Sequence, residues 1–375
     1  MVESLKGKRS KLGDLRCKFV NNTSEFVKNN PWLANVPADI RDQARRDIAN
    51  AVMSNKAKQK KNPKHRYELQ FRSRKDKQQT LILLKKHWTR KRGQYTDCGL
   101  SYASYHVAGS RSTEPLPKQL ACDSHLIRDR LGKFYLCLSE LAAQNDEDEG
   151  ERKTPPAKFV AIDPGVRTFL TGYDPSGQII EFGAKDMGGL FRLGLHLDRL
   201  QGKIAANQKK TSRNRMKKAA ERLRQRIHNL VDEVHKKAAL YLTTNYTQIL
   251  LPAFGVSGMV QHHGRKIHCK TVRQMLTWSH YRFRQRLLHK AKLASHCQVH
   301  VVTEEYTSKT CGKCGHVRPS FASKTFVCPE CTFRADRDYN AGRNILLLEL
   351  TKHGLSAPSI KKRNKRLRAL SLGSS

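Results

Sequence analysis

Hydrophobic residues follow two different periods in the second half of the chain. Short apolar runs between 159 and 182, interrupted by Asp163 and by the turn sequence DPSG at 174–177, predict an antiparallel meander of three strands. Between 187 and 243, apolar residues recur at alternating spacings of four and three, and Lys and Arg occupy the other positions. This seam consists of Met216, Ala220, Leu223, Ile227, Leu230 and Val234. It predicts a basic helical hairpin after the meander.

Similar patterns predict the remaining elements. Apolar runs at 249–251 and 299–302 indicate two further buried strands, and 272–294 indicates a helix between them. Nearer the start of the chain, 131–141 alternates as a strand does. A helix with one buried stripe is expected where Ile40, Ala44, Ile48 and Val52 recur at four-residue spacing. The elements predict a multidomain α/β protein, and a meander with an acid on its first strand is how a ribonuclease H-like fold begins.

The charge of the chain indicates a polyanionic partner. Among 375 residues, Lys and Arg number 72 and Asp and Glu 32, which gives a net charge of +40. The excess is spread along the chain, and a protein kept soluble by this charge alone would repel itself without gain. Neutralisation of phosphates by Lys and Arg is the main source of affinity for nucleic acid. A basic stretch at 58–80 adds Tyr67 and Phe71, aromatic residues that stack on bases.

Two CxxC pairs indicate a metal site. Thirteen residues separate the pairs, and Gly312 and Gly315 allow the tight turns that wrap each pair around one ion. The pairs are Cys311 with Cys314 and Cys328 with Cys331. Four thiolates suit tetrahedral Zn²⁺ and leave no position for substrate, so the predicted ribbon is structural. A cluster of core cysteines without metal is the alternative interpretation.

Acidic residues on both sides of this ribbon indicate hydrolysis of phosphodiesters. Such a reaction uses a metal-activated water and neutralisation of the leaving oxygen, which two Mg²⁺ ions about 3.5–4 Å apart provide. Mg²⁺ prefers carboxylate oxygens. Asp163 interrupts an apolar strand, Glu304 or Glu305 ends another, and Asp338 stands where a helix begins. A single Asp at a helix start is more often only a cap, but three acids at such junctions favour a catalytic site.

These segments resemble a known family. VAIDPGVRTFLTGYD, the basic helical stretch, LTWSHYRFRQRLLHKA, EYTSKTCGKCG and CPECTFRADRDYNAGRNIL occur in the order of the TnpB/OrfB proteins of insertion elements, of their eukaryotic Fanzor relatives and of compact type V CRISPR effectors. The resemblance spans about 158–350, and VPADIRDQARRDIANA and YELQFRSRKDKQQT extend it less specifically to the family's N-terminal wedge and recognition region.

The resemblance implies an RNA-guided DNA endonuclease. It implies a RuvC-like nuclease domain with an inserted four-cysteine zinc ribbon, an omega-type guide RNA, and Mg²⁺-dependent cleavage of matching double-stranded DNA beside a short flanking motif. A monomeric ribonucleoprotein with no membrane partner is expected. The predicted division of the chain is 1–141 for the wedge and recognition region, 142–157 for a linker, 158–310 for the first nuclease part (hairpin 187–243), 311–335 for the ribbon, 336–356 for the last nuclease part and 357–375 for a basic, disordered tail.

One departure from the family pattern bears on the catalytic acids. TnpB proteins usually carry the second acid at the end of the strand after the long helices, where this chain has Pro252. A proline cannot bind a metal, and the resemblance to Fanzor-like proteins implies a replacement just ahead of TSKTC. Glu304 is preferred to Glu305 by its position relative to TSKTC. Only one of the two is expected at the site, because successive strand residues face opposite ways.

Two other functions remain open from the sequence. A DNA-binding regulator without cleavage would explain the loss of the acid at Pro252, and an RNA-associated zinc-ribbon protein would explain the basicity but not Asp163. The chain starts without the apolar stretch of a signal peptide, and the six cysteines outside the pairs show no pattern, so a reducing intracellular compartment is expected. Fanzor-like identity and the basic run at 361–370 predict nuclear import.

Overall fold

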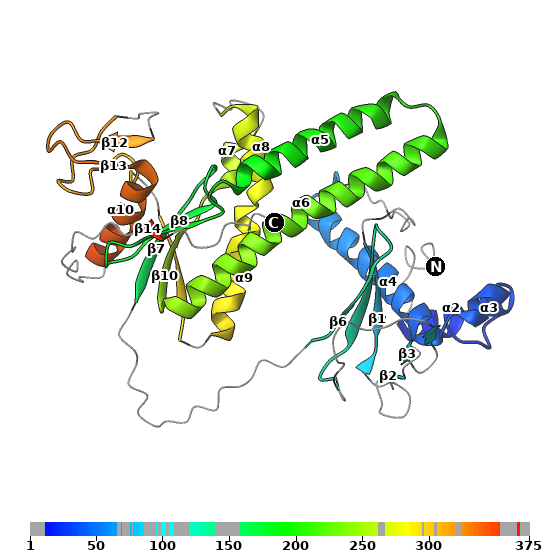
Figure 1. The fold of residues 1–375 in the computed structure, drawn as a ribbon. Coiled ribbons are helices and arrows are strands. Elements are labelled where there is room, and N and C mark those ends of the chain that lie inside the picture. The colour runs from blue at the N-terminus through cyan, green and yellow to red at the C-terminus, as the bar shows by residue number, and fades with distance from the viewer. Residues whose placement is uncertain are drawn as a thin grey trace, which may run out of the picture. The chain divides into compact units, whose positions relative to one another are not determined.

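The chain divides into two compact units, residues 1–143 and 144–375. The structure is a computed structural model, drawn as a ribbon in Figure 1. It describes residues 12–65, 69, 76, 78–85, 95–96, 99–102, 105–108, 117, 120–139, 158–261, 267–294, 296–303, 306–319, 324–352 and 366–367. Tyr67, Phe71, Glu304 and Glu305 lie outside these residues. Among the described residues, no helix has the length and apolar character that a membrane span requires.

The first unit combines helices with two small antiparallel sheets. Its helices are α2 (Leu12–Phe19), α3 (Glu25–Lys28), the 3₁₀ helix η1 (Pro31–Asn35) and α4 (Ala38–Lys61). Its strands are β1 (Gln78–Leu83), β2 (Tyr95–Thr96), β3 (Gly99–Tyr102), β4 (Tyr105–Ala108), β5 (Ser124–Asp129) and β6 (Phe134–Cys137). They form the sheets β1-β5-β6 and β2-β3-β4. Strand β6 lies within the strand predicted at 131–141.

The buried face of α4 differs from the predicted stripe. Val52 is buried, but Ala44 is exposed, and Arg41, Asp42 and Arg45 are among the buried residues. The Asp42 carboxylate accepts a hydrogen bond of 2.8 Å from Arg45 Nε and one of 3.0 Å from Arg46 Nε. The predicted helix is confirmed, and Ile40 and Ile48 are half-buried, so the stripe is wrong only at Ala44. The buried ion cluster was missed because an apolar period cannot reveal it.

A six-stranded mixed sheet organises the second unit. Its strands are β7 (Phe159–Pro164), β8 (Leu170–Tyr173), β9 (Ile179–Phe182), β10 (Gln248–Pro252), β11 (Gln298–Val302) and β14 (Arg366–Leu367), in the order β11-β10-β7-β8-β9-β14. Pairing is antiparallel between β7, β8 and β9, which confirms the predicted meander. Strands β7, β10 and β11 run parallel. Strand β14 pairs with β9 inside the tail predicted to be disordered, so that prediction is wrong for its two residues.

Turn DPSG is fixed by its own aspartate. Asp174 Oδ1 accepts hydrogen bonds from the backbone N–H groups of Ser176, at 2.9 Å, and Gln178, at 3.1 Å. Its other oxygen accepts a bond of 3.3 Å from the Tyr246 hydroxyl. Asp174 is a residue that such turns favour, and here it also ties the meander to the end of the helical hairpin.

Helices cover both faces of this sheet. The predicted hairpin is formed by α5 (Asp186–Ala206) and α6 (Lys210–Asn245), which lie side by side in Figure 1. With α8 (Cys269–Trp278) and α9 (His280–Leu293), the hairpin encloses the larger core, which includes Val160, Ile162 and Phe169. The short helix α7 is Val256–Met259. Helix α10 (Arg337–Lys352) covers the opposite face, called here the α10 face, and packs on Ala161, Leu250 and Val302.

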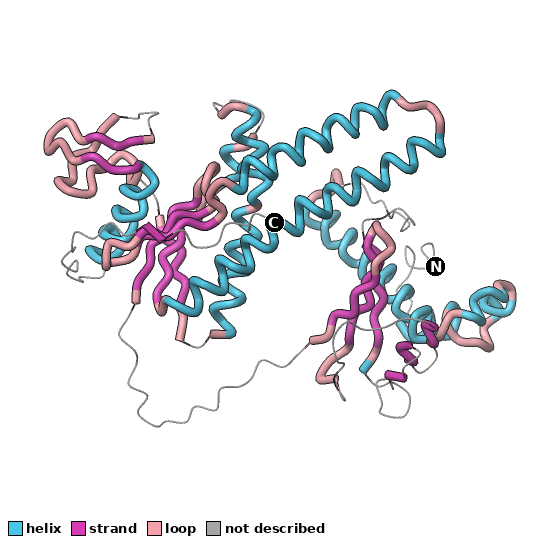
Figure 2. Tube along the Cα trace, viewed as in Figure 1, coloured by secondary structure: helices cyan, strands magenta, loops and turns pink. Residues whose placement is uncertain are grey.

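The helix predicted at 272–294 is two helices. Ser279 has a φ of 53°, in the left-handed region, so α8 ends and α9 begins there. The remaining hairpin, β12 (Thr325–Val327) with β13 (Arg334–Asp336), leads directly into α10. Figure 2 shows the same elements by type, with this small hairpin next to α10.

Candidate functional site

Asp163 lies near the end of the first strand of the meander, on the α10 face. Its neighbours Val160 and Ile162 face the larger core, whereas Ala161 packs in the cluster under α10. Because side chains alternate along a strand, Asp163 shares the face of Ala161. It is half-buried and pairs with Thr171 of β8. Asp163 thus lies on the first strand, as predicted from the sequence, and on the face opposite the larger core.

The turn that follows Asp163 is closely packed. A Cβ atom on Gly165 would lie 2.4 Å from the Thr168 carbonyl oxygen, a separation that no side chain tolerates. The Trp278 indole N–H donates to the Val166 carbonyl at 2.9 Å, and His280 Nε2 lies 3.1 Å from the Gly165 carbonyl oxygen. The junction between α8 and α9 therefore holds this turn in place.

An aromatic stack completes that junction. The Phe169 ring stacks on His235, with centroids 4.8 Å apart, and on His280, at 5.1 Å. His235 Nε2 lies 2.8 Å from the Trp278 carbonyl oxygen. Burial lowers the pKa of His235 to about 3 and that of His280 to about 4, so both rings are neutral donors at neutral pH. WSHY, which includes Trp278 and His280, is part of the sequence resemblance, but the sequence predicts no role for them.

Asp338 lies in the first turn of α10, directly after β13. Asp336, directly before the helix, acts as its cap, because Asp336 Oδ1 accepts the Asp338 backbone N–H at 3.0 Å. The Asp338 carboxylate lies 3.7 Å from Arg337 Nε. Its burial raises the pKa of Asp338 above the ordinary value, despite that nearby guanidinium. A partly buried carboxylate of this kind gains from a cation beside it.

The elements that carry the two aspartates touch each other. A Cβ atom on Gly342 would lie 3.9 Å from the Ala161 carbonyl oxygen and 3.3 Å from Tyr173 Cβ. Asp338 precedes Gly342 by about 6 Å of helix, and Asp163 follows Ala161 by about 6.6 Å of strand. The two aspartates therefore stand on elements that are in direct contact, each about two to four residues along its own element from that contact.

The third predicted acid lies beyond the described end of β11. Val302 packs under α10, Thr303 is the last residue described before the gap, and Glu304 and Glu305 lie outside the described residues. Strand β11 is the neighbour of β10, and Val302 pairs with Pro252. Leu250 lies under α10 as well, so Pro252, two residues later, belongs to the same face.

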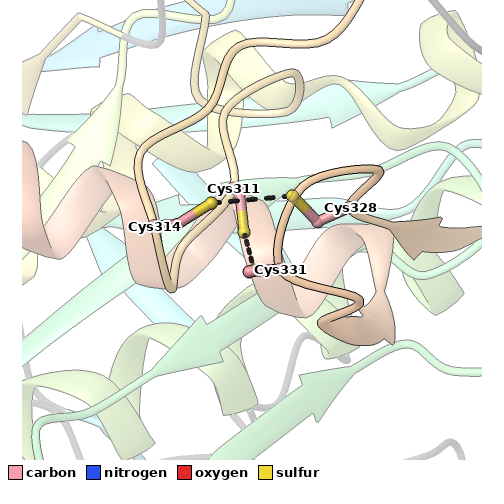
Figure 3. Close-up of side chains that lie close together, drawn as sticks. All are labelled: Cys311, Cys314, Cys328 and Cys331. Atoms are coloured by element: carbon pink, nitrogen blue, oxygen red, sulfur yellow. Dashed lines mark hydrogen bonds between the residues drawn. The ribbon is translucent and has the colours of Figure 1, made fainter.

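The four predicted cysteines form one cluster. Their Sγ atoms all lie within 4.8 Å of one another, and Figure 3 shows them turned toward a common centre. The pairs Cys311–Cys331 and Cys314–Cys328 are 3.6 Å apart. Zinc–sulfur bonds of about 2.3 Å give a tetrahedron with edges of about 3.8 Å, so the residues present fit Zn²⁺. Among the described residues, these four cysteines are the group of His, Cys, Asp or Glu side chains whose ligand atoms lie close enough together to hold one metal ion.

Two protein-family models match parts of this chain. The model OrfB_IS605, "Probable transposase", matches residues 141–263, and the model "Cas12f1-like, TNB domain" matches residues 280–345. These two segments of the chain are similar to the two families. This agrees with the resemblance to TnpB/OrfB proteins drawn from the sequence.

Several relatives are similar over longer stretches. A protein of Paramecium bursaria Chlorella virus 1 named as a transposase is 28% identical over 86% of this chain and 72% of its own length. A TnpB-like protein of Acanthamoeba polyphaga mimivirus is 28% identical over 50% of this chain but 37% of its own length. The CRISPR-associated endodeoxyribonuclease Cas12f1 of Sulfoacidibacillus thermotolerans is 26% identical over 65% of this chain and 56% of its own.

Among solved structures, a chain of a Cas12f1–sgRNA–target DNA complex matches with a TM-score of 0.38 at 17% identity. The match covers 60% of this chain and 45% of that chain. A likeness of this size supports no conclusion about the site.

Proposed function

We propose that this OrfB_IS605-type protein is an RNA-guided endonuclease that cleaves guide-matched double-stranded DNA. The observation that carries the proposal is the contact of helix α10, with Asp338 in its first turn, with strands β7 and β8 of the mixed sheet, of which β7 carries Asp163. In this proposal the second unit is a RuvC-like nuclease domain, the cysteine cluster is its zinc ribbon, and the first unit is a wedge for nucleic acid.

The acids of the proposed site would hold Mg²⁺. Asp163, Asp338 and Glu304 supply hard carboxylate oxygens, which Mg²⁺ prefers. Two bound ions supply an activated water and neutralise charge on the leaving oxygen. Extension of the β11 alternation by two residues from Val302 assigns Glu304 to the α10 face and Glu305 to the other, which is our reason to prefer Glu304.

The surface of the hairpin supports a nucleic-acid partner. Helix α6 is 36 residues long and is basic on the faces that do not pack. Its exposed cations are Lys210, Arg215, Lys217, Lys218, Arg222, Arg224, Arg226 and Lys236. These cations extend over about 39 Å of helix, which is long enough to contact several phosphates of a nucleic acid rather than a single anion. We assign the guide RNA, of the omega type, and the target DNA as partners.

We further propose a Fanzor-like identity with nuclear localisation. The support is the absence of an acid at Pro252, the glutamates ahead of TSKTC, and the basic run at 361–370. Most of that run lies outside the described residues. The relatives from large DNA viruses of eukaryotic hosts are compatible with this assignment.

The function is tested with the ribonucleoprotein purified with its RNA. Wild-type protein, incubated with Mg²⁺ and DNA that matches the RNA, should cut it, whereas Asp163→Asn should bind the same DNA and cut about 10³-fold more slowly. The estimate takes several kcal/mol of metal stabilisation lost with one ligand. Glu233→Gln, which changes an α6 carboxylate paired with Lys237, is the control and should cut normally. Binding without cleavage by wild-type protein would favour the regulator instead.

A further inference from the structure

Helix α10 holds the first cysteine loop through two buried asparagines. Asn340 Oδ1 accepts the Gly312 backbone N–H at 2.9 Å, and Asn340 Nδ2 donates to the Thr310 carbonyl at 2.7 Å. Asn344 Nδ2 donates to the carbonyls of Thr307 and Thr310, both at 2.7 Å. The two side chains lie one helical turn apart and are 0% and 7% exposed. We call Asn340 and Asn344 the asparagine clamp.

The clamp is specific for this loop. Buried amides are costly unless they are bonded, and here the partners are backbone atoms of residues 307–312 rather than variable side chains. The fit is close on the loop side as well. A Cβ atom on Gly312 would lie 2.9 Å from Asn340 Oδ1 and 3.1 Å from Asn344 Oδ1. Gly312 is therefore required for the clamp to close, whatever its part in the turn of the CxxC pair.

The clamp joins the two parts of the molecule that the proposed chemistry needs. On the loop side, Thr310 and Gly312 flank Cys311, a member of the cysteine cluster. On the helix side, Asn340 follows Asp338 by two residues. Movement of the loop against α10 would thus change the position of Cys311 and of Asp338 relative to each other.

The same contacts bracket the glutamates. Thr303, just before them, has its hydroxyl 3.4 Å from Lys352 Nζ near the end of α10. Thr307, just after them, is bonded to Asn344. The chain from Thr303 to Gly312 is therefore tied to α10 on both sides of Glu304 and Glu305.

We propose that Asn340 and Asn344 are positioning residues that couple the metal-loaded cysteine loop to the carboxylate site. The inference rests on the proposed nuclease function only for the identity of that second site. Two ligands whose sites share one rigid link affect each other reciprocally. Zinc in the cluster should therefore strengthen binding of the divalent ions at the carboxylates, and loss of the clamp should weaken both sites.

The experiment compares the wild-type ribonucleoprotein with Asn340→Ala and Asn344→Ala. Zinc release to a chelator, hydrogen exchange of the amides at 307–312, and Mn²⁺ binding followed by electron paramagnetic resonance are measured without cleavage. The Mg²⁺ concentration for half-maximal cleavage is measured in parallel. Asn245→Ala is the matched control, because Asn245 also donates to a backbone carbonyl, that of Tyr241 at 2.8 Å, but on the exposed end of α6.

The clamp variants should release zinc about tenfold faster, exchange faster at 307–312, and need about tenfold more Mn²⁺ or Mg²⁺, the usual effect of removing a residue that orients metal ligands. Saturating Mg²⁺ should restore most of the cleavage rate, which a purely structural defect would not allow. Gly312→Ala should reproduce these changes from the loop side. Gly202→Ala, at a glycine with no atom near its Cβ position, should not.

The measurements test the clamp, its coupling to the carboxylates and the proposed nuclease function separately. Unchanged zinc release and exchange in both clamp variants would overturn the clamp itself. Faster zinc release with an unchanged Mn²⁺ affinity would overturn the coupling to the carboxylates. A wild-type protein that binds Mn²⁺ but cuts no matched DNA would contradict the proposed nuclease, while the zinc and Mn²⁺ measurements would still decide the clamp.

Discussion

The paired histidines around Phe169 predict how the second unit responds to acid. His235 and His280 are 0% and 5% exposed, and each holds a backbone carbonyl through Nε2. The Nδ1 atoms of both rings are buried without a hydrogen-bond partner in the described part of the chain. Protonation of either ring would place a charged, unbonded N–H in the core. Burial accordingly lowers the pKa of His235 to about 3 and of His280 to about 4.

The sign of the effect follows from these values. An unfolded histidine takes up a proton near pH 6.5, but the folded rings do so only near pH 4 and pH 3. Acid therefore favours the unfolded chain. The stability that the folded protein gains from keeping these histidines neutral is fully present above pH 6.5 and is lost as the pH falls toward 4 and below. Between pH 7.5 and pH 5.0, proton linkage gives a loss of about 2 kcal/mol for each histidine, or about 4 kcal/mol for the pair.

Urea titrations at the two pH values measure this loss. Trp278 is fully buried beside the stack and reports its unfolding once the other two tryptophans, Trp32 and Trp88, are replaced by phenylalanine. His235→Gln and His280→Gln keep a side-chain N–H donor but remove the titrating group. Each should unfold more easily at pH 7.5, and each should reduce the difference between the two pH values by about 2 kcal/mol.

A control and an opposing result complete the test. His196→Gln, at an exposed position of α5, should leave the difference between pH 7.5 and pH 5.0 unchanged. If His235→Gln and His280→Gln also retain the full difference, the histidines are not held neutral in the folded protein.

Further predictions concern the metals, the acids and the tail. Cys311→Ser should lower the zinc content measured by elemental analysis from one ion per chain to none and unfold the ribbon, because structural zinc contributes directly to folding; a full complement of zinc would contradict this. Glu304→Ala should abolish guided cleavage while Glu305→Ala retains it, and the reverse outcome would move the third ligand to Glu305. Deletion of 358–375 should shift a fluorescently tagged protein toward the cytoplasm without loss of cleavage in vitro. Unchanged nuclear accumulation would place the import signal elsewhere in the chain.

The elements predicted from the sequence are those with local signals. Alternation between 159 and 182 and the DPSG turn are sufficient for the meander, because both depend on neighbours in the chain. The seam of the hairpin and the two CxxC pairs have their own spacing, and the structure contains both. For the same reason, Asp163 and Asp338 could be selected as acids at a strand and at a helix start.

The elements missed by the sequence depend on contacts between distant segments. The break at Ser279 has no local signal, since serine rarely adopts a left-handed backbone conformation, and it exists because Trp278 and His280 reach the turn at 165–166. The asparagine clamp could have been suspected, because Asn340 and Asn344 stand one turn apart on an apolar helix face. Their partners could not have been identified, because 28 to 37 residues separate them in the chain.

The strand order bears on how a site of this kind tolerates Pro252. Strand β10 lies between β7, which carries Asp163, and β11, which leads to Glu304. Pro252 pairs with Val302, so in the proposed site an acid at Glu304 instead of at the end of β10 lies one strand over, about 4.8 Å, and two residues further along, about 6.6 Å by strand geometry. Proline donates no backbone N–H and closes the pairing of β10 without weakening its earlier residues. Proline at this position therefore costs the sheet little. In the proposed site, the third acid then belongs to the chain after Val302, whose flanking residues Thr303 and Thr307 contact α10.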